Sequence, residues 1–327
     1  MENIKTELNL YNNNQLSNEA KIHSDEKFIE IFINQKATTT QKTYRRTVAE
    51  FQAYLYTQNI FELREADIVA ANNYKNDISS YVKSNGKPLS PATIVNRLNT
   101  LSSMYTFGQK IGYFKFNPFV VISKPKYDNK NQNKFINNEE ITYLFRAVKR
   151  LSSTEVLQKR NFLIVSMLLY TGMRISELCS IKWNDFFIDP KNRIGIRIKG
   201  KGGIWRSIKI RKELWFYIVD YRTSLNMNTK FSNNDDSPLF MNCSGDALTH
   251  WYIRKFLAKA SELAGLENKI TPHWFRHTSA SMSLANGADI KKVMSQFGWT
   301  NLRTPERYLH DISGFDEAAT DFIKVEI

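Results

Sequence analysis

Apolar residues recur at helical spacing along most of the chain, and the stripes begin near helix-start signals. Two stripes predict helices in the first third of the chain: Tyr44, Val48, Phe51 and Leu55, and then Ile94, Leu98, Leu101 and Tyr105. The first stripe follows the threonines of Thr38–Thr40, which are good capping residues, and the second follows Ser90-Pro91. Together they predict a small helical domain.

The same spacing continues after the first third. Three further helices are predicted over Asn137 to Val148, Lys159 to Thr171 and His250 to Gly265. Gly172 follows the second of them and marks its end. Thr271-Pro272 and Thr304-Pro305 each join a capping threonine to a proline at the first helical position, so they predict two more helix starts. The chain is therefore expected to be mainly α-helical.

One segment changes period. From Asn192 to Ile210 apolar and polar residues alternate, which predicts a β-hairpin or a small antiparallel sheet. We assign to its inner face Ile194, Ile196 and Ile198 on one arm and Ile204, Ser207 and Ile208 on the other. Gly200-Lys201-Gly202 forms the turn between the arms. The predicted fold class is mainly α with a small antiparallel β-sheet.

A single polar stretch separates two parts of the chain. Ile122 to Lys134 is basic, rich in asparagine and interrupted by proline, so it is the best domain boundary. The expected division is a flexible N-terminal tail over 1–22, a helical domain over 23–120, a linker over 121–135, and a second domain over 136–327 that ends in a short tail helix.

Composition narrows the class of partner. The chain has 327 residues, enough for about two domains, and a net charge of +14. This charge favours a polyanionic partner, although charge alone does not identify nucleic acid. Cys179 and Cys243 have no zinc-like spacing, so we expect reduced thiols, no metal site and a cytoplasmic protein. The longest apolar run is too short to cross a bilayer.

The region from Thr271 to His310 concentrates reactive side chains. His273, Arg276 and His277 stand three and four residues apart, so they crowd one side of a helix. Trp299 follows a glycine, and Tyr308 lies in the first turn of the helix that starts at Thr304-Pro305. A cationic helix side, an indole and a positioned phenol suit attack on a phosphodiester.

Two further cations precede this region. Arg174 comes directly after Gly172, and an arginine beside a buried helix end needs an anion or a carboxylate. Glu177 can supply the carboxylate, so a purely structural Arg–Glu pair is one alternative to phosphate binding. Lys201 lies in the glycine-flanked turn, with Lys199 as a nearby competitor.

These separated pieces resemble the signature of the tyrosine recombinases, the phage-integrase family. The matching stretches are Thr171 to Leu178 for the first arginine motif, Gly200-Lys201-Gly202 for the hairpin lysine, His273 to His277 for the H-x-x-R box, Gly298-Trp299, and Tyr308 nine residues after that tryptophan. The resemblance covers Asn137 to His310. It implies a two-domain, C-shaped DNA clamp, with a helical core-binding (SAM-like) domain and an α+β catalytic domain.

The resemblance also implies a role for each matching residue. Strands are cut and rejoined through a 3′-phosphotyrosine, with Tyr308 as the nucleophile and no cofactor or ATP. Arg174 and Arg276 stabilise the charged phosphorane. Imidazoles titrate near neutrality, so His273 suits the general base, and Lys201 is the acid for the 5′-oxygen. Trp299 donates to the phosphate, and Glu177 and His277 support the site.

The implied partner is double-stranded DNA carrying a specific recombination site. The family assembles as a dimer on each site and a tetramer in synapsis, and no membrane is involved. In the helical domain the candidate phosphate-binding residues are Lys42, Arg45, Arg46 and Arg97. The apolar positions Phe315, Ala318, Ala319 and Phe322 suggest a tail helix that docks on a neighbouring subunit or on its own domain. The nearest subclass is Xer-like or a transposon or plasmid recombinase.

Two alternatives remain open at this stage. A type IB topoisomerase shares the chemistry but relaxes DNA without synapsis, and a non-catalytic relative would bind DNA without needing a phenol. The basic helical domain and the complete set of reactive residues favour the recombinase. The chain departs from the family's usual pattern at Arg303-Thr304-Pro305, where threonines are commoner, and this bears on how freely the tyrosine helix moves.

Overall fold

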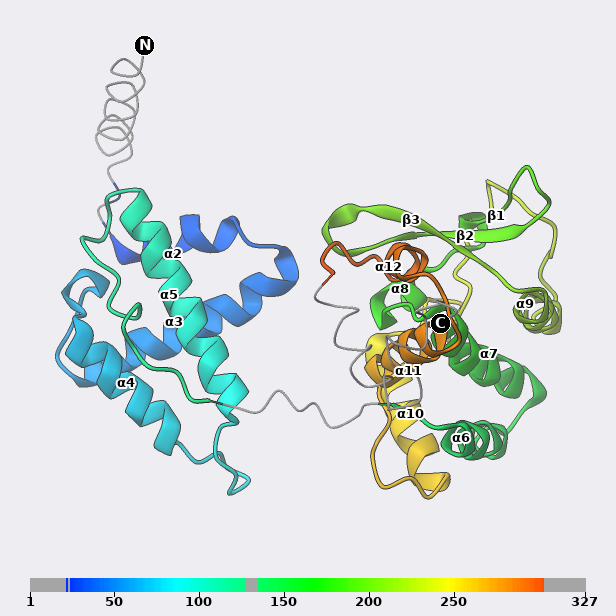
Figure 1. Ribbon diagram of the computed structural model, residues 1–327, viewed down its shortest axis with the longest axis horizontal. Coiled ribbons are helices and arrows are strands. Elements are labelled where there is room, and N and C mark those ends of the chain that lie inside the picture. Colours follow the sequence, from blue (N-terminus) through cyan, green and yellow to red (C-terminus); the bar gives the residue numbers. More distant parts are fainter. Residues whose placement is uncertain (1–21, 23, 127–134, 303–327) are drawn as a thin grey trace, which may run out of the picture. The chain divides into compact units, whose positions relative to one another are not determined.

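The computed structural model describes residues 22, 24–126 and 135–302, and the chain divides into two compact units between Asn129 and Lys130 (Figure 1). This division falls inside the segment 121–135 that the sequence indicates as a linker. Residues 1–21 of the tail expected over 1–22, the helix start at Thr304-Pro305, Tyr308 and the tail helix lie outside the described residues. Each unit is considered by itself.

Unit 1 is helical. The α-helices of its described part are α2 (Asp25–Asn34), α3 (Thr38–Thr57), α4 (Ile68–Ser80) and α5 (Pro91–Lys110). The predicted stripe of α3 is buried at Val48, Phe51 and Leu55, and the stripe of α5 is buried throughout, so both predictions are confirmed. The two helices pack against each other and share one core.

The ends of these helices follow local rules, with one correction. Ser90 caps α5 by accepting a hydrogen bond from the backbone N–H of Thr93 at 3.3 Å, and Pro91 opens the helix as predicted. The helix α3 begins at Thr38, so its N-cap is Ala37 and not one of the predicted threonines.

Unit 2 contains seven α-helices among its described residues: α6 (Asn138–Arg150), α7 (Glu155–Thr171), α8 (Ile175–Ser180), α9 (Lys212–Ser224), α10 (His250–Leu263), α11 (Pro272–Ala285) and α12 (Ile290–Phe297). The central helix is α7, which packs against α6, α9 and α11 (Figure 1). Asn137 and Glu140 form a capping box at α6, as the sequence indicates. Thr271 is the N-cap residue of α11, although its hydroxyl makes no capping bond among the described residues.

The sheet of unit 2 is antiparallel, with the strand order β1 (Phe186–Ile188), β2 (Ile194–Lys199) and β3 (Trp205–Lys209). Its inner face carries Ile196, Ile198 and Ile208, which are buried in the core of the unit. The inner face predicted for the second arm was partly wrong, because Ser207 points outward and Ile204 is 65% exposed. Since side chains alternate along a strand, the inner neighbour of Ile208 is Arg206. The predicted fold class, mainly α with a small antiparallel sheet, is confirmed.

The end of α7 is shaped by a glycine. Gly172 adopts φ +61° and closes the helix as a left-handed C-cap. A Cβ at this position would lie 2.3 Å from the ring of Phe297 on α12. Glycine therefore serves two purposes here, since it turns the chain towards Arg174 and admits the close approach of α12.

None of the helices in the described part of the chain is long and apolar enough to span a membrane.

Candidate active site

Arg276 projects from α11 into the core of unit 2. Its side chain donates from Nη1 to the carbonyl oxygen of Gly172 at 2.8 Å and from Nη2 to the carbonyl oxygen of Phe297. The guanidinium carbon lies 5.0 Å from the ring centre of Phe297 and 5.4 Å from that of Trp299. Only 5% of the residue is exposed. Arg276 therefore joins the ends of α7 and α12 to α11.

Arg174 lies two residues after Gly172, at the N-cap of α8. Its backbone N–H donates to Oε2 of Glu177 at 2.7 Å, and its Nη1 donates to Oε1 at 3.0 Å. One third of the Arg174 side chain is exposed, whereas that of Glu177 is buried. The Arg–Glu pair considered from the sequence is present, and the exposed edge of Arg174 remains accessible to a further anion.

Glu177 binds a second arginine, which the sequence analysis missed. Arg206 on β3 donates from Nη1 to Oε1 and from Nη2 to Oε2 of Glu177, both at 2.9 Å. Its Nε donates to the carbonyl oxygen of Gln296 at 2.8 Å. Burial alone would raise the pKa of Glu177, but the hydrogen bonds from Arg206 and from the Arg174 backbone outweigh it, so this pKa is lowered. The carboxylate is therefore held in its charged form.

The end of α12 prepares the position of Trp299. Gly298 adopts φ +62°, and the N–H of Trp299 reaches back to the carbonyl oxygen of Met294 at 2.9 Å, which closes the helix in a Schellman motif. The Trp299 ring lies 4.9 Å from that of Phe297. Gln296 donates to the carbonyl oxygen of Thr171 at 3.3 Å. The indole is thus fixed beside Arg276 by backbone geometry.

The two histidines of α11 lie side by side. The ring centres of His273 and His277 are 4.6 Å apart with the planes nearly perpendicular. His273 is exposed and His277 is half-buried. The predicted crowding of one helix side is therefore observed, with His273 at the accessible end, one residue after the opening proline.

The hairpin turn holds the predicted lysine. Lys201–Gly203 forms a short 3₁₀ turn between β2 and β3, closed by a hydrogen bond from the N–H of Gly200 to the carbonyl oxygen of Ile204 at 2.8 Å. The competitor Lys199 is exposed at the end of β2. The side chain of Lys201 and the whole of Tyr308 lie outside the described residues.

Taken together, the contacts form a closed circuit around the end of α7. Arg174 binds Glu177, Glu177 binds Arg206, and Arg206 binds the carbonyl oxygen of Gln296 on α12. The next residue, Phe297, accepts a hydrogen bond from Arg276, which also binds the carbonyl oxygen of Gly172. Four elements distant in the sequence are therefore held around two arginines. Such an arrangement is suited to stabilising a negatively charged phosphoryl group. Within the described residues there is no cluster of histidine, cysteine, aspartate and glutamate placed to hold a metal ion.

Comparisons with known proteins agree with this geometry. Residues 134–313 match the model of the phage integrase family. A tyrosine recombinase XerC from Listeria innocua is 31% identical over 272 residues, which cover 83% of this chain and 86% of that protein. The chain belongs to the phage integrase family.

A second curated relative extends the match. The tyrosine recombinase XerC of Bacillus pumilus is 30% identical over 293 residues, covering 88% of this chain and 91% of the relative. The chain is thus a tyrosine recombinase, and its activity is site-specific DNA recombination.

Two solved structures share the fold of this tyrosine recombinase. One is the XerH site-specific recombinase bound to a palindromic difH substrate in a post-cleavage complex, with a TM-score of 0.67, 21% identity, and coverage of 92% of this chain and 90% of that one. The other is a lambda integrase dimer bound to a COC′ core site, with a TM-score of 0.65, 16% identity, and coverage of 93% and 80%.

The predicted DNA-binding residues of the recombinase are not equivalent. Lys42, Arg45 and Arg46 are all exposed on α3. The side chain of Arg97 on α5 is only 15% exposed and pairs with Glu50 at 3.0 Å, and the same carboxylate binds Arg46 at 2.9 Å. Arg97 therefore helps to join α3 and α5. Lys42 and Arg45 are the better candidates for phosphate contact.

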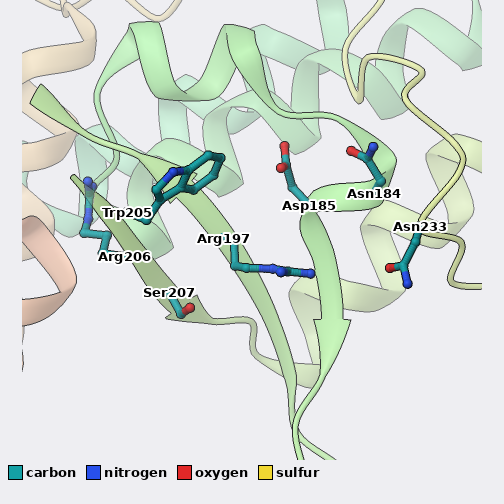
Figure 2. A pocket seen from close by; sticks show the side chains of 7 residues that line it. All are labelled: Asn184, Asp185, Arg197, Trp205, Arg206, Ser207 and Asn233. Atoms are coloured by element: carbon teal, nitrogen blue, oxygen red, sulfur yellow. The ribbon is translucent and has the colours of Figure 1, made fainter. Parts of the chain in front are cut away.

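A hollow of about 650 Å³ lies beside the sheet. Figure 2 shows its lining, made of Asn184, Asp185, Arg197, Trp205, Arg206, Ser207 and Asn233. Trp205 and Ser207 project from the face opposite to the one from which Arg206 reaches Glu177. Apart from Arg206, the hollow therefore involves none of the residues of the circuit.

Proposed function

We propose that this recombinase cuts and rejoins DNA through a 3′-phosphotyrosine on Tyr308, with the phosphate held between Arg174 and Arg276. The observation that carries the proposal is the hydrogen bond from Arg276 to the carbonyl oxygen of Gly172. It ties the second arginine to the turn from which the first one emerges. Two guanidinium groups fixed to one backbone turn require little rearrangement when charge develops on the phosphate.

The proposed step balances without a cofactor. The phenolic oxygen of Tyr308 attacks phosphorus, the new P–O bond forms, and the bond from phosphorus to the 5′-oxygen breaks. The phenol proton passes to His273, and the departing 5′-oxygen takes a proton from Lys201. Rejoining reverses the step, with a 5′-hydroxyl as the attacking group. The energy of the broken ester is kept in the phosphotyrosine, so neither ATP nor a metal ion is needed.

The remaining residues of the site take supporting roles in this proposal. Trp299 lies over the guanidinium of Arg276, where its ring excludes water, and we assign its indole N–H as a donor to the phosphate. Glu177 orients Arg174 through two hydrogen bonds. His277 packs edge-on against His273 and restricts the orientation of that ring.

We further propose that the partner is duplex DNA with a specific site, bound by both units. The support is the net charge of +14, the exposed basic residues of α3, and two solved structures of the same fold, bound to a difH substrate and to a COC′ core site. Recombination of two duplexes breaks and rejoins four strands. With one tyrosine for each strand, we propose a dimer on each site and a tetramer in synapsis. We also propose that the activity is cytoplasmic.

The test begins with a pool of nicked duplexes of random sequence. A nick beside the cleavage position lets the short severed strand diffuse away, which traps the covalent intermediate. We expect wild-type protein to give a complex that survives sodium dodecyl sulfate, and sequencing of the trapped DNA to reveal the preferred site. The Tyr308→Phe variant should bind the recovered duplex with unchanged affinity and yield no such complex. A covalent complex with Tyr308→Phe would refute the assignment.

A type IB topoisomerase-like activity is separated by a second assay. We expect the protein to join two duplexes that carry the recovered site and to leave plasmids without that site supercoiled. Relaxation of plasmids that lack the site, without joint products, would favour the topoisomerase.

A further inference from the structure

Arg206 is the residue through which the lysine hairpin and the arginine circuit meet. It lies on β3, five residues after Lys201, and its side chain is 10% exposed. It makes three hydrogen bonds to two different partners, namely two to the carboxylate of Glu177 and one to the carbonyl oxygen of Gln296. A lysine has no planar fork, so it cannot reproduce this set of contacts.

Two glycines of the reactive motifs leave room for the Arg206 guanidinium. A Cβ on Gly200 would lie 2.9 Å from Nη1 of Arg206, and a Cβ on Gly298 would lie 3.3 Å from the same atom. Gly298 also needs its left-handed conformation, but Gly200 has φ −83°, which any residue adopts. At Gly200, the close approach of Arg206 and of the hairpin backbone therefore explains the missing side chain.

The hydrogen bonds of Glu177 show how Arg206 affects the orientation of Arg174. Each carboxylate oxygen accepts one bond from Arg174 and one from Arg206. In the described part of the chain, with Arg206 present, the Arg174 side chain reaches Glu177 through Nη1. Without Arg206, each oxygen of the buried Glu177 carboxylate would lose one hydrogen bond. The Arg174 guanidinium would then turn to donate two hydrogen bonds to that carboxylate. The guanidinium would then turn away from its exposed side.

We infer that Arg206 is a positioning residue for strand cleavage, which acts through Glu177 to keep the guanidinium of Arg174 facing the phosphate. This inference rests on the proposed function, because it assumes that Arg174 binds the phosphate that Tyr308 attacks. Arg206 itself touches neither the DNA nor the reacting atoms.

The experiment uses the full chain and the duplex recovered with wild-type protein, in two chemical forms. One has the ordinary phosphate at the cleaved position. The other has a methylphosphonate there, in which a methyl group replaces one non-bridging oxygen and removes the negative charge. A neutral phosphoryl group makes a smaller demand on an arginine, so a variant that has misplaced Arg174 should lose less on this substrate.

We expect Arg206→Ala to slow cleavage of the ordinary duplex on the order of 100-fold, the effect of a small misplacement in a site. On the methylphosphonate the loss should shrink to less than about tenfold, and Arg174→Ala should show the same pattern. Arg206→Lys should lie between wild type and Arg206→Ala. All rates are compared per folded protein, measured by circular dichroism.

Two matched variants separate positioning from stability. Arg222 is another buried arginine of the same unit, and among the described residues its hydrogen bonds and ion pair go to Asn228, Ser237 and Asp235, outside the circuit. Arg222→Ala should lower thermal stability and leave cleavage per folded protein unchanged. If Arg206→Ala does not fold, Arg206→Met combined with Glu177→Gln removes both buried charges together. The loss in this pair should be no larger than that of Glu177→Gln alone and should shrink on the methylphosphonate.

Each remaining outcome overturns the inference. An equal loss on both substrates would mean that Arg206 has only a structural role. If the cleavage rate of Arg206→Ala recovered on a duplex with a bridging 5′-sulfur, and not on the methylphosphonate, Arg206 would act through the group that protonates the leaving 5′-oxygen. Wild-type rates in Arg206→Ala would exclude any role in cleavage. Failure of the wild-type protein to cleave any duplex would contradict the proposed function itself, which is a different result.

Discussion

The carbonyl oxygen of Gly172 accepts a hydrogen bond from Nη1 of Arg276 at 2.8 Å. Because Arg174 follows two residues later, this bond sets how far apart the two arginines lie. The same glycine admits the ring of Phe297, whose carbonyl oxygen receives the other terminal nitrogen of Arg276. One glycine thus connects the turn after α7, the end of α12 and the second arginine.

We expect Gly172→Ala to lower the free energy of unfolding more than an alanine at a left-handed glycine in open space. Gly265 is the matched control, with φ +70° and no atom near its Cβ position. Both variants share a conformational strain of roughly 1–2 kcal/mol. Gly172→Ala adds a clash with Phe297, worth about 1–3 kcal/mol more. Urea unfolding of both variants measures the difference, and equal losses would contradict the close packing.

Much of this site could be predicted from the sequence because its parts are local signals. Arg174, His273 and Arg276 lie in short motifs next to clear helix boundaries. Gly172 indicates the end of α7. The buried apolar stripes of α3 and α5 could be predicted equally well, because burial follows the helical period. What these signals could not supply is the set of carbonyl oxygens that Arg276 binds, which come from other elements.

Arg206 was missed for a related reason. Its partners Glu177 and Gln296 are 29 and 90 residues away in the sequence, so no local pattern links them. One signal was available. Counting back by two from the buried Ile208 places Arg206 on the inner face, and a buried arginine requires an acidic partner. The strand β1 was also missed, because three residues are too few to show an alternating pattern.

Glu177 should make the stability of unit 2 depend on pH in the acid range. Its pKa is lowered from the ordinary value of 4.5, so the folded state binds the proton less readily than the unfolded chain. The stabilisation is therefore complete above about pH 4.5 and is lost as the pH falls through the lowered value. The stability difference between wild type and Glu177→Gln should be largest near pH 7 and shrink towards pH 3. Thermal melts across this range measure it, and a constant difference would contradict the ion pairs.

The basic residues of unit 1 should separate into two kinds. Lys42 is exposed on α3, so Lys42→Ala should reduce the slope of log affinity against log salt by about 1, at unchanged thermal stability. Arg97 pairs with Glu50 at a largely buried position, so Arg97→Ala should lower stability and change the slope less. Fluorescence anisotropy with the recovered duplex gives both slopes. The reverse ranking would show that Arg97 is the phosphate contact.

The choice between the hairpin lysines has its own test. Lys201→Ala should be nearly inactive on ordinary DNA, because the 5′-oxygen would leave as an unprotonated alkoxide. A bridging 5′-sulfur leaves without a proton, so cleavage by Lys201→Ala should recover on that substrate. Lys199→Ala is the matched control and should cleave both substrates. Rescue of Lys199→Ala in place of Lys201→Ala would identify the other lysine as the acid, and Tyr308→Phe should stay inactive on both.

The most direct test of the account is the chemical identity of the covalent adduct. The trapped complex is digested with nuclease and trypsin, and the modified peptide is sequenced by tandem mass spectrometry. We expect one nucleotide joined through its 3′-phosphate to the phenolic oxygen of Tyr308, with a free 5′-hydroxyl on the severed strand. An adduct on another residue, or a 5′-phosphate linkage to the protein, would contradict the proposed mechanism.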